Sequence, residues 1–270
     1  MHEDWLIEAD VLPERGRIFC IASAGCTAFA LASRGASVTA VDANPAQIEY
    51  VQTRLDGGEP RPGSVERKLA RLRRLGRIAG WSPAALSEFC ALADGRAQVD
   101  FWREHLDTRR FRAGLALLLS PLSLRLAYSS PLVAAVPSRF GRVVRRRLER
   151  GFARHANRDN PYARFLLLGD AEQPARRPGL ELTLACADAA AFLEQSAPPS
   201  FDGFSLSNVL DGASPAYGRR LQAAVRRAAA PGAVAILRSF DEPASAEEYE
   251  WAARDRSLLW GSVRVEQADA

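Results

Sequence analysis

The chain has 270 residues, of which 47% are apolar and 25% are charged, the balance of an ordinary soluble globular protein. This composition is sufficient for a large hydrophobic core and excludes a wholly disordered, collagen-like or coiled-coil protein. The net charge is +4, and nearly all of the 36 basic residues are arginine, because Lys68 is the single lysine.

The first part of the chain alternates between strand and helix patterns. Strands are predicted at residues 17–23 and 37–41, and helices at residues 27–34 and 45–55. The first helix ends before Gly35, a C-cap glycine, and the second has Asn44 as its N-cap and Pro45 at its first position. This order and spacing are typical of a parallel sheet built from strand–helix–strand units.

The same alternation returns near the end of the chain. Strands are predicted at residues 180–186, 201–207, 233–240 and 258–265, helices at residues 189–195 and 215–230, and a turn at Pro231–Gly232. Residues 64–169, in between, show helical periodicity without convincing strands. Ser82 caps one predicted helix there, residues 94–107 hold another, and residues 139–155 form a basic amphipathic helix.

These patterns predict an α/β fold, a doubly wound sheet with a large helical insertion. Residues 1–63 and 170–270 are expected to form the two halves of the sheet domain. Residues 64–169 are expected to form the insertion, on the side where an acceptor or a membrane is met.

The first chemical signal is Gly25, directly after the first predicted strand. A glycine there is expected to let the chain approach a ligand closely, and the following helix directs its first N–H groups to the same place. Asp42 ends the second strand, where an acid accepts hydrogen bonds from the ribose hydroxyls of an adenosine. The alternative role for Asp42 is to cap the next helix. The full dinucleotide fingerprint GxGxxG is absent, which argues against NAD.

Two further strand ends carry polar residues. Asp188 follows the third strand, where it is expected to face the adenine amino group, to cap the next helix, or to do both. Ser207, Asn208 and Asp211 follow the fourth strand, at the sheet edge where α/β folds hold ligands, or they form a structural turn.

Several segments, in order, resemble one family. They are residues 22–26, 40–47, 160–162 with 168–169, 204–208, and 231–232 through 237–239. The most specific is Val-Asp-Ala-Asn-Pro-Ala-Gln at residues 41–47. Together they are similar to the S-adenosylmethionine:diacylglycerol 3-amino-3-carboxypropyltransferase family of betaine-lipid synthesis. The resemblance covers both sheet halves well and the insertion thinly.

This resemblance implies a Rossmann-like S-adenosylmethionine-dependent transferase fold, with S-adenosyl-L-methionine as cofactor. No metal is expected, because histidine and cysteine ligands do not cluster in the sequence. The cofactor-binding candidates are Ser23, Ala24, Gly25, Cys26, Asp42, Ala43, Asn44, Gln47, Asp188, Ala189, Ser207, Asn208 and Arg238. Arg238 is expected to hold the donor carboxylate, unless it forms a structural ion pair. The candidates for general base are His155, Tyr162 and Asp211. The alternative for His155 is a surface position on the basic helix, and the alternative for Tyr162 is packing in the core.

The implied reaction is 3-amino-3-carboxypropyl transfer to a lipid or small-molecule acceptor, with release of 5′-methylthioadenosine. The alternatives are a methyltransferase of lipid or natural-product metabolism, and a membrane- or RNA-associating module with a vestigial cofactor fold. Residues 139–154, together with the apolar run 113–126, are expected to contact an anionic membrane; the alternative is that residues 139–154 pair with nearby acids. Nucleic acid is disfavoured because aromatic residues are not interleaved.

The expected location is the cytoplasm, or the inner face of the membrane as a peripheral protein. The acidic N-terminus shows no targeting signal, and the longest apolar candidate, residues 113–126, is too short for a span. The four cysteines lie apart without CxxC or histidine-paired spacing, which excludes a disulfide scaffold and a zinc site and fits a reducing compartment.

Overall fold

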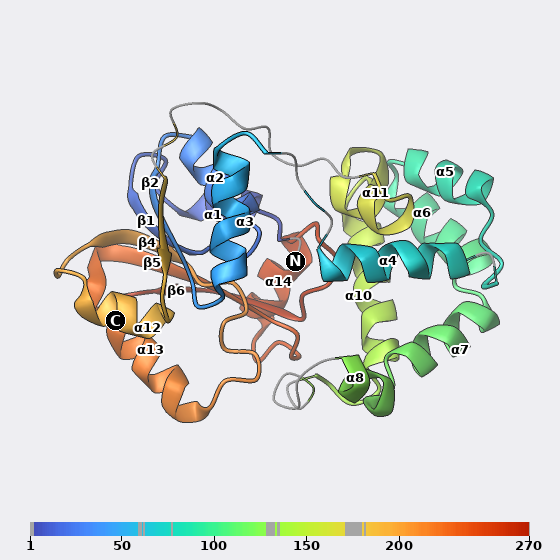
Figure 1. Cartoon of the computed structure of the whole chain (residues 1–270). Helices are drawn as coiled ribbons and strands as arrows, with labels where there is room; N and C mark the ends of the chain where they lie inside the picture. The colour runs from blue at the N-terminus through green and yellow to red at the C-terminus, as the bar shows by residue number, and fades with distance from the viewer. Residues whose placement is uncertain are drawn as a thin grey trace.

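The computed structural model describes residues 3–58, 61, 63–76, 78–127, 133, 136–170, 180 and 182–269. A six-stranded sheet forms one side of the molecule and a group of helices the other (Figure 1). The strands are β1 (Arg17–Ile21), β2 (Ser37–Asp42), β3 (Leu182–Cys186), β4 (Phe201–Ser205), β5 (Ala229–Ser239) and β6 (Ser262–Gln267). The predicted α/β class is therefore confirmed.

The sheet has the order β3-β2-β1-β4-β5-β6, in which every neighbouring pair is parallel except β5 and β6. This order is that of a doubly wound fold, and only the antiparallel β6 departs from an all-parallel sheet. Cys20 of β1 lies opposite Ala40 of β2 and Ser205 of β4. The carboxyl ends of these three strands therefore meet at one edge of the sheet.

Helices cover both faces of the sheet, each over its own apolar core. One face packs against α1 (Leu6–Val11), α2 (Cys26–Ser33), α3 (Pro45–Leu55) and α14 (Ala246–Arg254), and the other against α12 (Ala189–Gln195) and α13 (Pro215–Ala228). Adjacent residues of β1 alternate between the two cores, as the pleat requires: Ile18 and Cys20 lie in the first and Phe19 in the second.

The described residues between α3 and β3 contain helices and no strand, as predicted. These elements are α4 (Ser64–Leu75), α5 (Pro83–Ala91), α6 (Gly95–Phe101), the π-helix Trp102–Leu106, α7 (Arg109–Leu118), α8 (Pro121–Ala127), α10 (Phe140–Arg154), the 3₁₀ turn Asn157–Asp159 and α11 (Pro161–Leu167). They enclose a third core around Trp102, Phe89 and Phe152, all buried. None of the helices in the described ranges has the length and hydropathy of a membrane span.

One buried arginine of α10 joins these helices to the sheet. The Arg147 guanidinium donates to the carbonyl oxygens of Leu259 (3.1 Å) and Phe240 (2.8 Å), in the segments that flank β6 and follow β5. Burial lowers the pKa of Arg147 to about 10. Gly261 leaves the room for this contact, because a side chain there would collide with the Asp241 carbonyl and with Arg147.

The structure corrects the element boundaries near the C-terminus. Helix α13 ends at Ala228, two residues before the predicted end, and β5 already begins at Ala229. The predicted turn at Pro231–Gly232 is instead a bulge within β5, where the pairing with β4 shifts and Gly232 has a φ of +76°. The last strand starts at Ser262 rather than at residue 258, because Leu258 has a φ of +71° and packs against Gly151 of α10. Helices α1 and α14 had no counterpart in the predicted elements.

Candidate functional site

Asp42 connects the ends of β1 and β2 at the carboxyl edge of the sheet. One carboxylate oxygen accepts a hydrogen bond from the Ser23 amide (3.0 Å), in the loop that follows β1, and the other accepts from the Asn44 amide (2.9 Å). Each oxygen keeps a second lone pair for another donor. Asn44 also caps α3, since its side chain accepts from the Ala46 amide (3.1 Å). The capping role therefore belongs to Asn44, and Asp42 remains half-buried beside the loop.

Two serines at this edge have left-handed backbone conformations. Ser23 has a φ of +44° and Ser207 a φ of +53°, and they follow the adjacent strands β1 and β4. A non-glycine residue pays about 1–3 kcal/mol for such a conformation, and residues of this kind cluster at ligand sites. Among the described non-glycine residues with positive φ, these two lie where the sequence predicts the cofactor, and Arg139 and Leu258 lie elsewhere.

Gly25 is required by the packing of the loop. Its φ is +81°, and a Cβ atom would lie 2.9 Å from Phe29 and 3.0 Å from Val51, in the helices α2 and α3. The close approach of a ligand to Gly25 stays a prediction. Arg54 of α3 holds the same loop, because its guanidinium donates to the Ala24 carbonyl and lies 3.4 Å from the Cys26 sulfur.

Asp188 caps α12, as the sequence allowed, and both of its oxygens have partners. One accepts from the Ala191 amide (2.9 Å) and the other from the Tyr217 hydroxyl (2.7 Å). Arg220 lies 3.4 Å away. Burial and this hydrogen bond raise the pKa of Tyr217 to about 12. The neighbouring Ala189 is buried. A contact of Asp188 with adenine stays a prediction.

Asn208 and Asp211 form a fixed turn after β4. Asn208 donates its amide to Asp211 (3.1 Å), which also accepts from the Ser239 hydroxyl (2.6 Å) and the Phe240 amide (3.1 Å). The carbonyl oxygen of the Asn208 side chain faces the Ser207 hydroxyl at 3.4 Å. These bonds place the turn beside the strained serine.

Tyr162, at the start of α11, reaches the same edge. Its hydroxyl donates to the Glu3 carbonyl (2.6 Å), and the Glu3 carboxylate in turn accepts from Ser207. Burial raises the pKa of Tyr162, so its proton is held at neutral pH. The structure therefore links Tyr162 to Ser207, Asn208 and Asp211.

His155 lies outside this chain of contacts among the residues that the structure describes. Its Nε2 donates to the Ala253 carbonyl (2.9 Å), and burial lowers its pKa. The ring lines a pocket of about 260 Å³ together with Arg34, Asp10 and Arg254. Of the three candidate bases, Tyr162 and Asp211 are therefore linked through hydrogen bonds, and His155 is separate from them.

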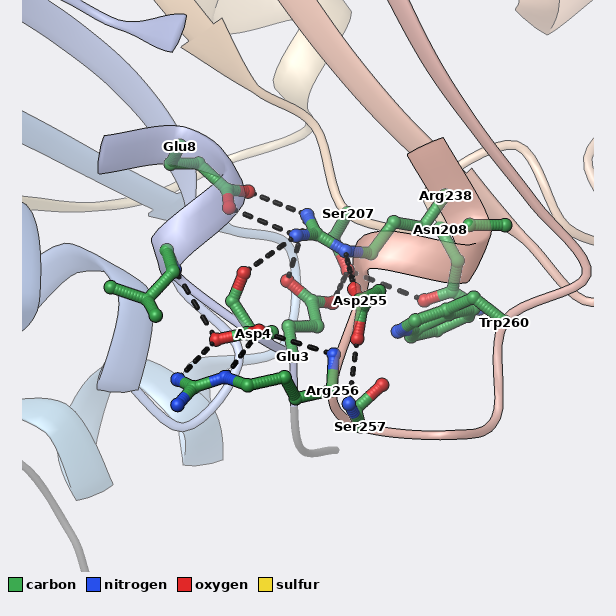
Figure 2. Close-up of polar contacts among 12 residues, drawn as sticks. Glu3, Asp4, Glu8, Ser207, Asn208, Arg238, Asp255, Arg256, Ser257 and Trp260 are labelled. Atoms are coloured by element: carbon green, nitrogen blue, oxygen red, sulfur yellow. Dashed lines mark hydrogen bonds and ion pairs between the residues drawn. The ribbon is translucent and has the colours of Figure 1, made fainter. Parts of the chain in front are cut away.

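Arg238 lies inside the protein, among carboxylates (Figure 2). Its guanidinium donates to Asp255 (3.0 Å), to Glu8 (2.9 Å) and to the Asp4 carbonyl (3.1 Å). The side chain is 0% exposed. Of the two roles expected for Arg238, these contacts match the structural ion pair, and they leave its donors engaged in the protein.

This buried cluster contains more negative than positive groups. Its carboxylates are Glu3, Asp4, Glu8 and Asp255, and its guanidinium groups are Arg238 and Arg256. Burial raises the pKa of Glu3 and of Asp255. Although burial alone lowers the pKa of Arg238, the charge of Glu8 and the hydrogen bond to it raise that pKa above its ordinary value. No local sequence pattern points to the acids, which come from both ends of the chain.

The arginines of α10 are largely engaged. Arg145 pairs with Asp107, Arg154 pairs with Glu250 (3.0 Å), and Arg150 donates to the Trp260 carbonyl (2.9 Å). A groove of about 330 Å³ is lined by Val99, Arg103, Arg142, Arg145, Arg146, Glu149, Arg150 and Ala153. Several arginines of α10 therefore pair with nearby acids, which was one of the two roles expected from the sequence. Within the described ranges, no three His, Cys, Asp or Glu side chains gather as metal ligands.

The left-handed backbone and the close packing at Gly25 predict that a side chain at this position lowers the stability of the protein. Gly25→Ala is expected to lower the free energy of unfolding by about 2–4 kcal/mol, because left-handed strain adds to collisions with Phe29 and Val51. Gly232→Ala is the matched control: its φ is similar, but no atom lies within 4 Å of the added Cβ. It is expected to cost about 1 kcal/mol. Urea denaturation measures both, and equal losses would contradict the packing role.

The excess of buried negative charge predicts opposite effects for two substitutions. Arg238→Met is expected to lower the free energy of unfolding by about 3–5 kcal/mol, because Glu8 and Asp255 stay buried without their counter-charge. Glu3→Gln is expected to leave stability unchanged or raise it at pH 7, since an amide still accepts from Ser207 and one buried charge disappears. Denaturant titrations of both variants test this. A large loss in Glu3→Gln would show that the cluster needs that charge.

Comparison of the chain with family models, with curated proteins and with solved structures finds no match. What the protein does is therefore inferred from its strand order and from the residues at the carboxyl edge of its sheet.

Proposed function

We propose that the chain binds S-adenosylmethionine at the carboxyl edge of β1, β2 and β4 and transfers its 3-amino-3-carboxypropyl group to a lipid or another small acceptor. The observation that carries this proposal is the contact of Asp42 with the Ser23 amide at 3.0 Å. It brings the acid of β2 beside the loop of β1, the arrangement in which doubly wound folds hold an adenosine.

The edge fits the polar part of such a ligand. Asp42 keeps one lone pair on each oxygen for the ribose hydroxyls. Ser23 and Ala24 lie in the loop that follows β1, Asn44 lies directly before α3, and Gln47 lies in the first turn of α3. The doubly wound order of the strands is compatible with the Rossmann-like sheet that the family resemblance implies.

The donor supplies a sulfonium that activates the carbons attached to it. The protein's part is positioning, and a well-placed nucleophile contributes several kcal/mol to the rate. Because Arg238 is engaged with carboxylates, the first N–H groups of α2 are the better partners for the donor carboxylate. The carbonyl oxygen of the Asn208 side chain can accept from the donor ammonium group.

The proton states favour one of the three candidate bases. Tyr162 holds its proton at neutral pH, and Asp211 already accepts three hydrogen bonds. His155 is neutral because burial lowers its pKa, and its Nε2–H is used by Ala253, so Nδ1 presents the basic lone pair. His155 is thus the candidate that the proton states favour. The pocket it lines includes Arg34, directly after the end of α2, and neither Asp42 nor Ser23.

Isothermal calorimetry with S-adenosylmethionine tests the binding site. Asp42→Asn is expected to weaken binding about tenfold or more, because it removes an ionised acceptor of two hydroxyls. Asp202→Asn is the matched control, since Asp202 pairs with Arg17 (3.0 Å) at the start of β1, the opposite edge of the sheet. Equal affinities in the Asp42 variant and in the wild-type protein would exclude this site.

Product analysis tests the reaction. With S-adenosylmethionine and diacylglycerol in mixed micelles, the protein is expected to release 5′-methylthioadenosine, measured by mass spectrometry. S-adenosylhomocysteine as the product would identify a methyltransferase instead. Turnover in His155→Gln at the wild-type rate would remove His155 from the mechanism.

A further inference from the structure

A long stretch of the helical part contains no acidic residue. Residues 108–148 include no Asp or Glu, whereas nine arginines occur there: Arg109, Arg110, Arg112, Arg125, Arg139, Arg142, Arg145, Arg146 and Arg147. Much of this stretch forms α7, α8 and the first part of α10. Positive charge is therefore concentrated on one group of adjacent helices.

The same stretch exposes large apolar side chains. Leu117 is 72% exposed, Leu122 71%, Leu126 82% and Leu118 38%. These four residues, here called the leucine surface, lie in the last turn of α7 and along α8. Helix α7 has no buried residue at all. An exposed apolar group of this kind marks a site of interaction.

The geometry of the α7–α8 corner holds these leucines outward. Two residues join the helices, and the Ser123 hydroxyl donates to the Leu117 carbonyl (2.8 Å) across the corner. Leu122 and Leu126 lie four positions apart and share one face of α8, while Leu124 between them is buried. The interior of the corner is thus already filled by Leu124.

Arginines with no acidic partner flank the leucine surface. Arg125 of α8, Arg139 directly before α10, and Arg142 are exposed, and in the part of the chain that the structure describes none of them pairs with a carboxylate. Arg145, by contrast, is neutralised by Asp107. The uncompensated charge therefore lies beside the leucines rather than along the whole of α10.

We propose that the leucine surface, with Arg125, Arg139 and Arg142, docks on an anionic lipid bilayer. Leucines enter the boundary between headgroups and acyl chains, and the arginines meet lipid phosphates and carboxylates. Of the membrane contact expected from the sequence, this keeps residues 113–126 and the start of α10, and it leaves out the rest of α10, where Arg145 and Arg154 pair with acids. The docking needs no turnover and is independent of the function proposed above.

Charge and side-chain type favour a bilayer over the other occupants. A second copy docked through the same surface would bring arginines against arginines with no acid between them. Nucleic acid would meet aliphatic leucines, which do not stack on bases. The nearby aromatic rings are already packed, Phe111 against Trp102 and Phe140 against Phe240.

Flotation with vesicles tests the proposal. The full chain is expected to float with vesicles of phosphatidylglycerol and phosphatidylcholine, and not with phosphatidylcholine alone. The double variant Leu122→Gln with Leu126→Gln is expected to associate about tenfold more weakly, and Arg125→Gln about fivefold. All three side chains are exposed, so the fold is unaffected, and circular dichroism checks this.

Two substitutions are matched controls. Ile78→Gln changes a residue of similar exposure, 68%, next to Ala79, whose carbonyl accepts from Thr108 at the opposite end of α7, about 15 Å from the leucines. Arg226→Gln removes an exposed arginine of α13, on the sheet side of the molecule. Both are expected to float like the wild-type chain.

Three results would overturn the proposal. The first is no flotation of the wild-type chain with the anionic vesicles. The second is equal flotation of the leucine variant and the wild-type chain. The third is a wild-type dimer that the leucine variant converts to a monomer in sedimentation, which would assign the surface to contacts between copies.

Discussion

The buried ion cluster around Arg238 holds together parts of the chain that no local pattern connects. Arg238 lies on β5, Glu8 on α1, and Asp255 directly after α14. Because a buried guanidinium is costly without its carboxylates, these three segments are tied to each other's positions. The N-terminal segment is thereby drawn to the carboxyl edge of β4, where Glu3 meets Ser207 and the Tyr162 hydroxyl meets the Glu3 backbone.

The helical part depends on a second buried arginine that uses a different partner. Arg147 donates mainly to backbone carbonyls of the segments that join β5 to β6, and the carboxylate it pairs with, Glu242 at 3.4 Å, is half exposed to solvent. This difference accounts for the directions of the two pKa shifts: burial dominates at Arg147, and carboxylates dominate at Arg238. Both arginines converge on the segment before β6, where Trp260 is buried between the two parts of the molecule.

The sequence predicts the structural features that depend on residues close together in the chain. It misses the features that depend on residues far apart. The first two strands, the helix Pro45–Leu55 and the caps Asn44 and Asp188 follow from apolar runs and cap chemistry within a few positions. The bulge at Gly232 depends on pairing with β4, and Glu8, one of the acids around Arg238, lies 230 positions away in the sequence. Gly25 shows the same limit within the candidate site, since its glycine is explained by Val51 of another helix.

The arginines, which the composition does not distinguish, differ in the groups that neutralise their charges. Arg238 and Arg147 have their partners inside the protein, and Arg145 pairs with the buried Asp107. These arginines are therefore not available to a partner. Around α8 no acid occurs for many residues on either side, so the charges there remain open to solvent and ions. Leucines left exposed among uncompensated arginines bring no benefit to the isolated fold. The anionic bilayer proposed above would give both features a partner, because its interior is apolar and its headgroups are anionic.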